Sequence, residues 1–193
     1  MTSWPTCLAG RPSGVVFDCD GLLVDTEPSW ALAGEQMFDR RGLSHNAADH
    51  AALLGMSTYD SVVLLAQRFG EVGREDALFD ELLAEVVGLL ELGVVPMPGA
   101  AELVARLREL EVPIAVASNS PRVVVELALR KSGLSEAFGT VVTADDVTRP
   151  KPAPDPYLVA CDRLGVTASA AVGCEDSRTG LAAVQAAGLA SIG

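Results

Sequence analysis

The chain has 193 residues, of which 49% are hydrophobic and 21% are charged. This balance is typical of a folded domain with a hydrophobic core, and it excludes disordered, collagen-like and low-complexity classes. The formal net charge of −12 argues against binding to nucleic acid or to an anionic membrane surface. Apolar runs such as residues 86–90 are far shorter than the about 20 residues of a membrane-spanning helix.

The cysteines form no CxxC pair and have no histidine at metal-ligand spacing, and the chain begins with no secretory segment. We therefore expect reduced thiols in a cytoplasmic protein at the four positions Cys7, Cys19, Cys161 and Cys174. Fourteen residues are basic, but just two of them are lysines, Lys131 and Lys151.

Short β-branched runs alternate with longer stretches of helical spacing, the pattern of a parallel sheet with crossover helices. Strands are predicted over residues 14–18, 114–118, 140–143, 168–173 and 189–192. Helices are predicted over 99–110, 121–132, 154–164 and 177–187. The predicted fold class is α/β, with a doubly wound, Rossmann-like parallel sheet.

The stretch between the first two strands is long and helical, with helices predicted near residues 27–41, 47–54, 59–69 and 75–92. A crossover needs one helix, so we interpret residues 27–95, the helical insert, as an all-helical subdomain. Residues 1–26 and 96–193 then form the core. The insert holds twelve acidic residues and four arginines, so it accounts for −8 of the net charge.

Polar side chains follow four of the predicted strands, where ligands bind in doubly wound sheets. Asp18 and Asp20 follow the first strand, Ser118 and Asn119 the second, and the proline-flanked Lys151 the third; Glu175 and Asp176 follow the fourth. Each feature alone is common in turns and helix caps. Together they place carboxylates suited to Mg²⁺ beside a hydroxyl and an ammonium that can hold phosphate.

These motifs resemble those of the haloacid dehalogenase superfamily of aspartyl phosphotransferases. Its first motif, hhhDxDGxLxD[ST], is matched by VVFDCDGLLVDT at residues 15–26. Ser118, Lys151 before Pro152, and the Glu175-Asp176 pair match the others. The insert directly after the first motif resembles the α-helical cap of the group that contains β-phosphoglucomutase and sugar-phosphate phosphatases.

The resemblance implies a Mg²⁺-dependent phosphatase in which Asp18 attacks phosphorus to form an aspartyl-phosphate. Asp20 would protonate the leaving alcohol and then deprotonate water. Asp18, the Asp20 carbonyl and Asp176 would hold Mg²⁺, with Glu175 near the metal. Ser118 and Lys151, helped by Asn119, would bind the phosphoryl oxygens. The implied substrate is a small phosphorylated metabolite, such as a sugar phosphate.

Other proteins with similar motifs have different activities. Dehalogenases lack the second aspartate of the pair, and phosphonatases use a cap lysine that the insert lacks. A hexose-phosphate mutase remains open, although Thr58 stands where that enzyme has an arginine. A phospho-receiver domain has no room for the insert, and a non-catalytic phosphate-binding relative also stays open. The segment that contains Thr58 is also a candidate substrate pocket, formed by Gly55, Met56, Ser57 and Thr58.

Other residues are expected to be structural. Asp25 and Thr26 would support the turn, His45 and His50 would be solvated, and the helical spacing of Trp30 and Met37 is typical of helix core. We expect a monomer or weak homo-oligomer with no nucleic-acid or membrane partner. The resemblance also implies a further loop and helix after residues 190–193.

Overall fold

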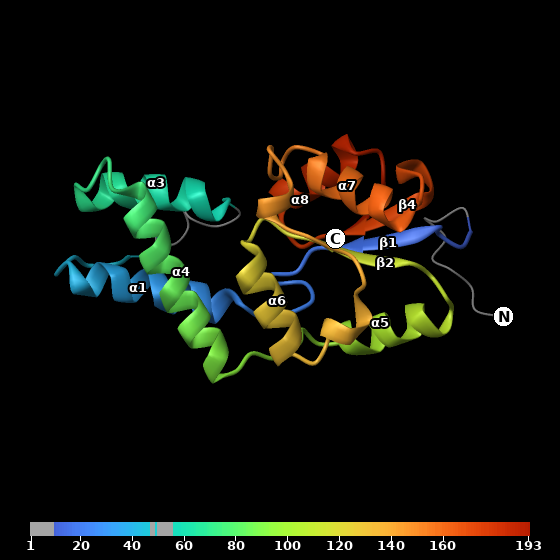
Figure 1. Cartoon of the computed structure of the whole chain (residues 1–193), viewed down its shortest axis with the longest axis horizontal. Helices are drawn as coiled ribbons and strands as arrows, with labels where there is room; N and C mark the ends of the chain where they lie inside the picture. The colour runs from blue at the N-terminus through green and yellow to red at the C-terminus, as the bar shows by residue number, and fades with distance from the viewer. Residues whose placement is uncertain (1–9, 47–48, 50–55) are drawn as a thin grey trace.

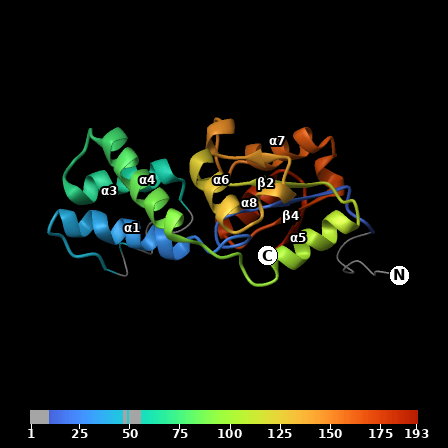
Figure 2. The ribbon, with the colours of Figure 1, turned by 60° about the horizontal axis from the view of Figure 1, so that its bottom comes forward.

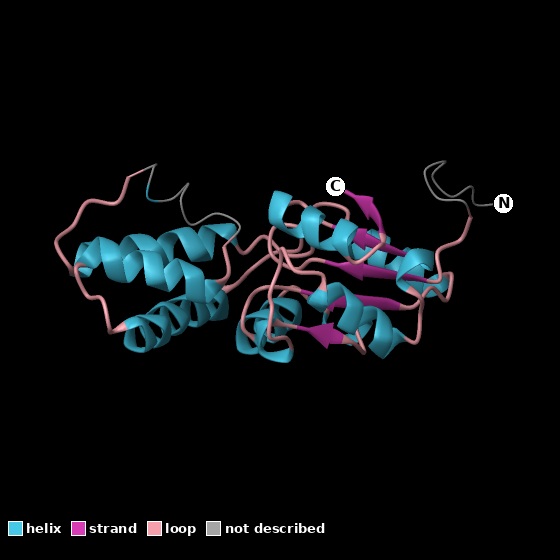
Figure 3. Cartoon of the chain, turned by 90° about the horizontal axis from the view of Figure 1, so that it is seen from above, coloured by secondary structure: helices cyan, strands magenta, loops and turns pink. Residues whose placement is uncertain are grey.

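The computed structural model describes residues 10–46, 49 and 56–193. Its centre is a five-stranded parallel sheet in the order β3-β2-β1-β4-β5, which confirms the predicted fold class (Figure 3). The strands are β1 (Gly14–Phe17), β2 (Ile114–Ala117), β3 (Val141–Val142), β4 (Ala171–Cys174) and β5 (Ala190–Ile192). The first strand along the chain therefore lies at the middle of the sheet, between β2 and β4.

Helices cover both faces of the sheet, because successive β1 side chains point to opposite sides. Val15 and Phe17 belong to the core under α5 (Ala100–Glu109) and α6 (Arg122–Lys131). Val16 belongs to the core under α7 (Asp155–Leu164) and α8 (Arg178–Ala186). Figure 1 shows the two pairs of helices on opposite sides of the strands.

The strand predicted over residues 168–173 is wrong at its start. Residues 168–170 form the 3₁₀ turn η3 (Ala168–Ala170), and β4 begins at Ala171. The Ala-Ser-Ala sequence lacks the β-branched side chains that favour a strand. Two further 3₁₀ turns, η1 (Ser135–Ala137) and η2 (Ala144–Asp146), flank the short strand β3.

The described part of the helical insert contains α1 (Glu27–Arg40), α3 (Thr58–Phe69) and α4 (Glu75–Leu92). These helices pack around buried side chains that include Met37, Phe38, Leu65, Leu82 and Val86. Figure 2 shows them as a lobe beside the sheet. Most of the helix predicted over 47–54, together with His50, Gly55 and Cys7, lies outside the described residues.

Two segments connect this lobe to the sheet, and they pair with each other. Val24 and Pro96 form an antiparallel bridge, flanked by hydrogen bonds from the Asp25 N–H to the Val95 carbonyl (3.0 Å) and from the Met97 N–H to the Leu23 carbonyl (2.9 Å). The chain therefore leaves and re-enters the core at one place, beyond the carboxyl end of β1. None of the helices in the described ranges is both long and apolar enough to cross a membrane.

Candidate active site

Asp18 and Asp20 lie where β1 ends and the chain turns toward the insert. The Asp18 N–H donates to the Cys174 carbonyl of β4 at 3.0 Å, which fixes the backbone at the sheet edge. Gly21 follows with φ of 80°, and a Cβ there would lie 2.5 Å from an Asp176 carboxylate oxygen. Glycine therefore permits both the left-handed turn and the close approach of a second acidic loop.

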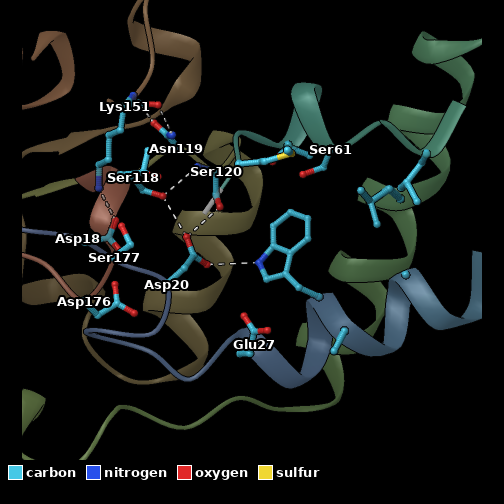
Figure 4. Close-up of a pocket in the computed structure, with 18 of the residues that line it drawn as sticks. Asp18, Asp20, Glu27, Ser61, Ser118, Asn119, Ser120, Lys151, Asp176 and Ser177 are labelled. Atoms are coloured by element: carbon cyan, nitrogen blue, oxygen red, sulfur yellow. Dashed lines mark hydrogen bonds and ion pairs between the residues drawn. The ribbon is translucent and has the colours of Figure 1, made fainter. Parts of the chain in front are cut away.

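Lys151 reaches the same place from the loop before α7, and its side chain is 4% exposed. Its Nζ lies 2.6 Å from Asp18 Oδ1 and 2.5 Å from Glu175 Oε1. Figure 4 shows the Lys151 side chain directed at Asp18. Burial favours the neutral amine, but the charges of Asp18 and Glu175 outweigh it and raise the pKa of Lys151. Burial raises the pKa of Asp18 to about 7, against the opposing effect of Lys151.

Glu175 is completely buried and holds Lys151 in place. Its Oε1 also accepts a hydrogen bond from the Tyr157 hydroxyl at 2.6 Å, and its Oε2 accepts one from the Ser177 hydroxyl at 3.0 Å. The carboxylate lies directly against Gly180 of α8, where a Cβ would come within 1.8 Å of the carboxyl carbon. Burial and the charge of Glu175 raise the pKa of Tyr157, so this tyrosine stays a hydrogen-bond donor.

Asp20 is bound by four side-chain donors that come from both parts of the molecule. Oδ2 accepts from the hydroxyls of Ser118 (3.0 Å) and Ser120 (2.8 Å), as Figure 4 shows. Oδ1 accepts from the Thr26 hydroxyl at 2.7 Å and from the Trp30 indole at 3.5 Å. The Asp20 carboxylate is thus turned away from Lys151 and toward the insert.

Asn119 contacts the Lys151 loop rather than a carboxylate. Its amide donates to the Lys151 carbonyl at 3.1 Å and accepts from the Lys151 N–H at 2.8 Å. Both polar atoms of the Asn119 side chain therefore fix the backbone that presents the ammonium.

Asp18, Glu175 and Asp176 each offer an oxygen within 4.8 Å of the others. Asp176 has an exposed side, but partial shielding of its carboxyl from water, together with the nearby charge of Glu175, raises its pKa. A cation beside this group would relieve the repulsion among the carboxylates. A set of hard oxygen donors with an open side fits Mg²⁺.

A cavity of about 300 Å³ lies between the sheet edge and the helical insert. Its core wall is polar and includes Asp18, Asp20, Ser118, Ser120, Lys151 and Asp176. Its insert wall is more apolar and includes Glu27, Trp30, Met56, Thr58, Ser61 and Leu82. All seven site residues predicted at the strand ends therefore lie at or directly behind the core wall.

The candidate pocket segment divides in the structure. Met56 and Thr58 line the cavity. Ser57 instead caps the N-terminus of α3, where its hydroxyl accepts from the Asp60 N–H at 3.2 Å and donates to the Asp60 carboxylate at 2.7 Å. Gly55 lies outside the described residues.

Sequence reasoning assigned no role to two residues of the site, and it misplaced Trp30 and His45. His45 was expected to be solvated, but it is partly buried and lines the cavity. Ser120 and Tyr157 had no assigned role, although Ser120 follows two predicted site residues directly and that spacing was a usable signal. Trp30 was expected in the helix core, but it lines the cavity and donates to Asp20. Met37 is fully buried, as the helical spacing predicts.

Comparison with known proteins settles the family. The model of the haloacid dehalogenase-like hydrolases matches residues 12–188. The chain belongs to this family. It is therefore an enzyme of the hydrolase class, and the resemblance seen in its motifs is confirmed.

Two curated relatives are phosphatases. Validoxylamine A 7'-phosphate phosphatase of Streptomyces hygroscopicus subsp. limoneus is 32% identical over 92% of this chain and 83% of its own length. Fructose-1-phosphate phosphatase YqaB of Escherichia coli is 33% identical over 94% of this chain and 96% of its own. Among solved structures, CbbY of Rhodobacter sphaeroides in complex with phosphate is 26% identical, with a TM-score of 0.83 over 94% of this chain and 85% of that chain.

Proposed function

We propose that the chain hydrolyses a small phosphorylated metabolite, such as a sugar phosphate, through a covalent aspartyl-phosphate. Family membership and phosphatase relatives make it a phosphoric monoester hydrolase. The observation that carries the finer proposal is the Asp18 carboxylate, which faces the cavity beside Lys151 with the separately held carboxylate of Asp20 nearby.

In the first step, an Asp18 oxygen attacks phosphorus and the bond from phosphorus to the ester oxygen breaks. Asp20, in its protonated form, gives its proton to that departing oxygen, so that a neutral alcohol leaves. Lys151 and the Ser118 hydroxyl bind phosphoryl oxygens during the transfer, because the developing negative charge must be neutralised.

In the second step, Asp20 accepts a proton from a water molecule, whose oxygen attacks phosphorus. The bond between phosphorus and Asp18 breaks, which releases inorganic phosphate and regenerates both carboxyl groups. The four donors around Asp20 fix the position from which its proton is given and taken.

Asp18, Asp176 and the Asp20 carbonyl would hold Mg²⁺, with Glu175 beside it. When bound, Mg²⁺ would neutralise charge on the phosphoryl oxygens and on Asp18. The oxygen donors of Asp18, Glu175 and Asp176 support this assignment because they lie within reach of one ion.

The helical insert, residues 27–95, would act as a cap over a core formed by residues 1–26 and 96–193. Thr26 and Trp30 support this division, because they link the start of α1 to Asp20 at the cavity. A closed cap would exclude bulk water from the aspartyl-phosphate until the alcohol has left. Buried free thiols at Cys19, Cys161 and Cys174 fit a reducing, cytoplasmic location.

The test is the Asp18→Asn variant, assayed for phosphate release from an aryl phosphate with Mg²⁺ and with a chelator. We expect turnover to fall at least about 1,000-fold, because an amide cannot act as the nucleophile. The matched control is Asp39→Asn on the exposed side of α1. This variant should release phosphate at the rate of the unmodified protein. Undiminished hydrolysis by a folded Asp18→Asn protein would contradict the proposal.

A further inference from the structure

Gly34 lies in the middle of α1 and lines the cavity from the side of the helical insert. Its backbone is right-handed helical, so the conformation of the chain does not itself require glycine at this position. Glycine within a helix is less favourable than alanine, because its backbone loses more conformational freedom on folding. A reason for glycine has to come from the surroundings of this residue.

Close neighbours account for two other buried glycines, but not for Gly34. A Cβ at Gly173 would lie 2.6 Å from a methyl carbon of Val184, and one at Gly180 would lie 1.8 Å from the carboxyl carbon of Glu175. At Gly34 a Cβ would meet no neighbouring atom within 4 Å, although the residue is buried. Because protein interiors are close-packed, open space beside a buried residue belongs to the cavity rather than to a packed helix face.

The cavity extends along α1 from the active site into the insert. The residues of α1 that line it recur at three- and four-residue spacing and so share one face of the helix: Glu27, Trp30, Ala31 and Gly34. The start of α1 lies at the active site, since the preceding Thr26 donates to Asp20. With a rise of about 1.5 Å per residue, Gly34 lies about 10 Å further along the helix than Glu27.

The walls around this extension are largely apolar. Leu65 of α3 and Leu82 of α4 line the cavity together with Ala31 and Met56. Helix α4 packs against both α1 and α3, and Figure 1 shows it running across them. The described polar residues on the insert side are Glu27, His45, Thr58 and Ser61. An apolar group that enters between the leucines and Gly34 leaves water, which favours its binding.

We propose that Gly34 is a specificity residue, and that its missing side chain keeps the cavity open for an apolar group at the end of the leaving alcohol away from the phosphate. This inference rests on the proposed phosphatase activity. The leaving alcohol is the occupant because Asp18 and Lys151, at the phosphoryl position, line the same cavity. An ester whose alcohol is too short to reach Gly34 leaves the space unfilled and is a poorer substrate.

The experiment measures kcat/KM for ethyl, butyl and hexyl phosphate. These esters have leaving alcohols of nearly equal acidity, so they differ in apolar length rather than in reactivity. Each methylene that leaves water should raise kcat/KM about fourfold. We therefore expect hexyl phosphate to be favoured over ethyl phosphate by about 100-fold.

The Gly34→Leu variant fills the space beside α1 and should lower the hexyl-to-ethyl ratio about 30-fold. The matched control is Gly88→Leu, because Gly88 also lies within a helix of the insert with no atom within 4 Å of a Cβ, but it is exposed and does not line the cavity. This control should keep the ratio of the unmodified protein.

The Gly34→Ala variant tests the open space without relying on the larger side chain. Alanine has room beside Gly34 and favours the helix, so the melting temperature should rise by about 2–4 °C. The hexyl-to-ethyl ratio should fall about threefold, since one methyl group occupies part of the space.

A hexyl-to-ethyl ratio near one in the unmodified protein, or a ratio that both Gly34 variants leave unchanged, would overturn the inference. So would a Gly34→Ala protein that melts below the unmodified one, or hydrolysis of an aryl phosphate without hydrolysis of any alkyl phosphate. If the protein hydrolyses no phosphate ester at all, including the aryl phosphate, the proposed function itself fails.

Discussion

The two walls of the cavity are built on different principles. In the core wall, Lys151 and Glu175 centre a buried set of polar contacts, and the hydroxyls of Ser118 and Ser120 bind the partly buried Asp20 beside it. The insert wall is mostly apolar, and the arginines of the insert bind carboxylates of their own lobe. The core wall is therefore held by buried ion pairs and hydrogen bonds, whereas the insert wall is shaped mainly by the packing of its helices.

The largest effect is expected from Gly180→Ala, which disturbs Glu175 behind the core wall. Alanine there would place its Cβ 1.8–2.0 Å from the carboxyl atoms of Glu175, so the carboxylate or α8 must move. Because Glu175 is buried and paired with Lys151, we expect the free energy of unfolding to fall by about 3 kcal/mol. Turnover should drop at least about 100-fold. Denaturant unfolding measures the change in stability, and phosphate release measures the change in turnover.

The matched control for Gly180→Ala is the same substitution in the insert. Gly88 lies within α4, and a Cβ there would meet no atom within 4 Å. Gly88→Ala should stabilise the protein by about 0.5–1 kcal/mol, since alanine favours the helix, and should leave turnover unchanged. Equal stability and turnover in the two alanine variants would refute the contrast between the walls.

A smaller effect is expected where the walls meet, at Thr26. Its hydroxyl donates to Asp20 at 2.7 Å, and the residue is fully buried directly before α1. Thr26→Val keeps the shape but removes the donor, which leaves Asp20 less firmly placed for the proton transfer proposed for it. We expect kcat to fall about tenfold with a smaller change in KM.

Thr148→Val serves as the control for Thr26→Val, because Thr148 is exposed and does not line the cavity. A Thr26→Val enzyme with the kcat of this control would show that the Trp30 and serine donors suffice to hold Asp20.

The core wall could be largely predicted from the sequence because parallel strands bring their carboxyl ends to one edge. Asp18, Ser118 and Glu175 each follow a recognisable strand, so their proximity follows from the order of elements. Tyr157 could not be found in this way. On helix α7 its spacing is that of a core aromatic residue. The role of its hydroxyl depends on a hydrogen bond to Glu175, which the fold brings close and the local sequence does not reveal.

The insert wall was harder to predict for a related reason. Helical periodicity reveals that a face is covered, but it does not distinguish packing against a neighbouring helix from lining a cavity. Met37 and Trp30 share one spacing pattern, yet the first is fully buried and the second donates to Asp20. The direction in which α1 leaves the core decides between them.

The smallest expected effect concerns a core carboxylate outside both walls, and it separates the stability of the core from its chemistry. Burial alone would raise the pKa of Asp146, but hydrogen bonds from Arg163 and Thr143 and the charge of Arg122 lower it to about 2. Asp146 therefore stabilises the fold fully above about pH 4, and this contribution disappears as the pH falls through about 2.

Since solvent screens a partly exposed carboxylate, Asp146→Asn should cost about 1 kcal/mol at neutral pH. The difference from the unmodified protein should shrink steadily from pH 5 to pH 2 in urea unfolding, while kcat stays unchanged. Glu126→Gln removes an exposed partner of Arg122 and should have almost no effect at any pH. A stability difference for Asp146→Asn that grows toward low pH would contradict the assigned sign.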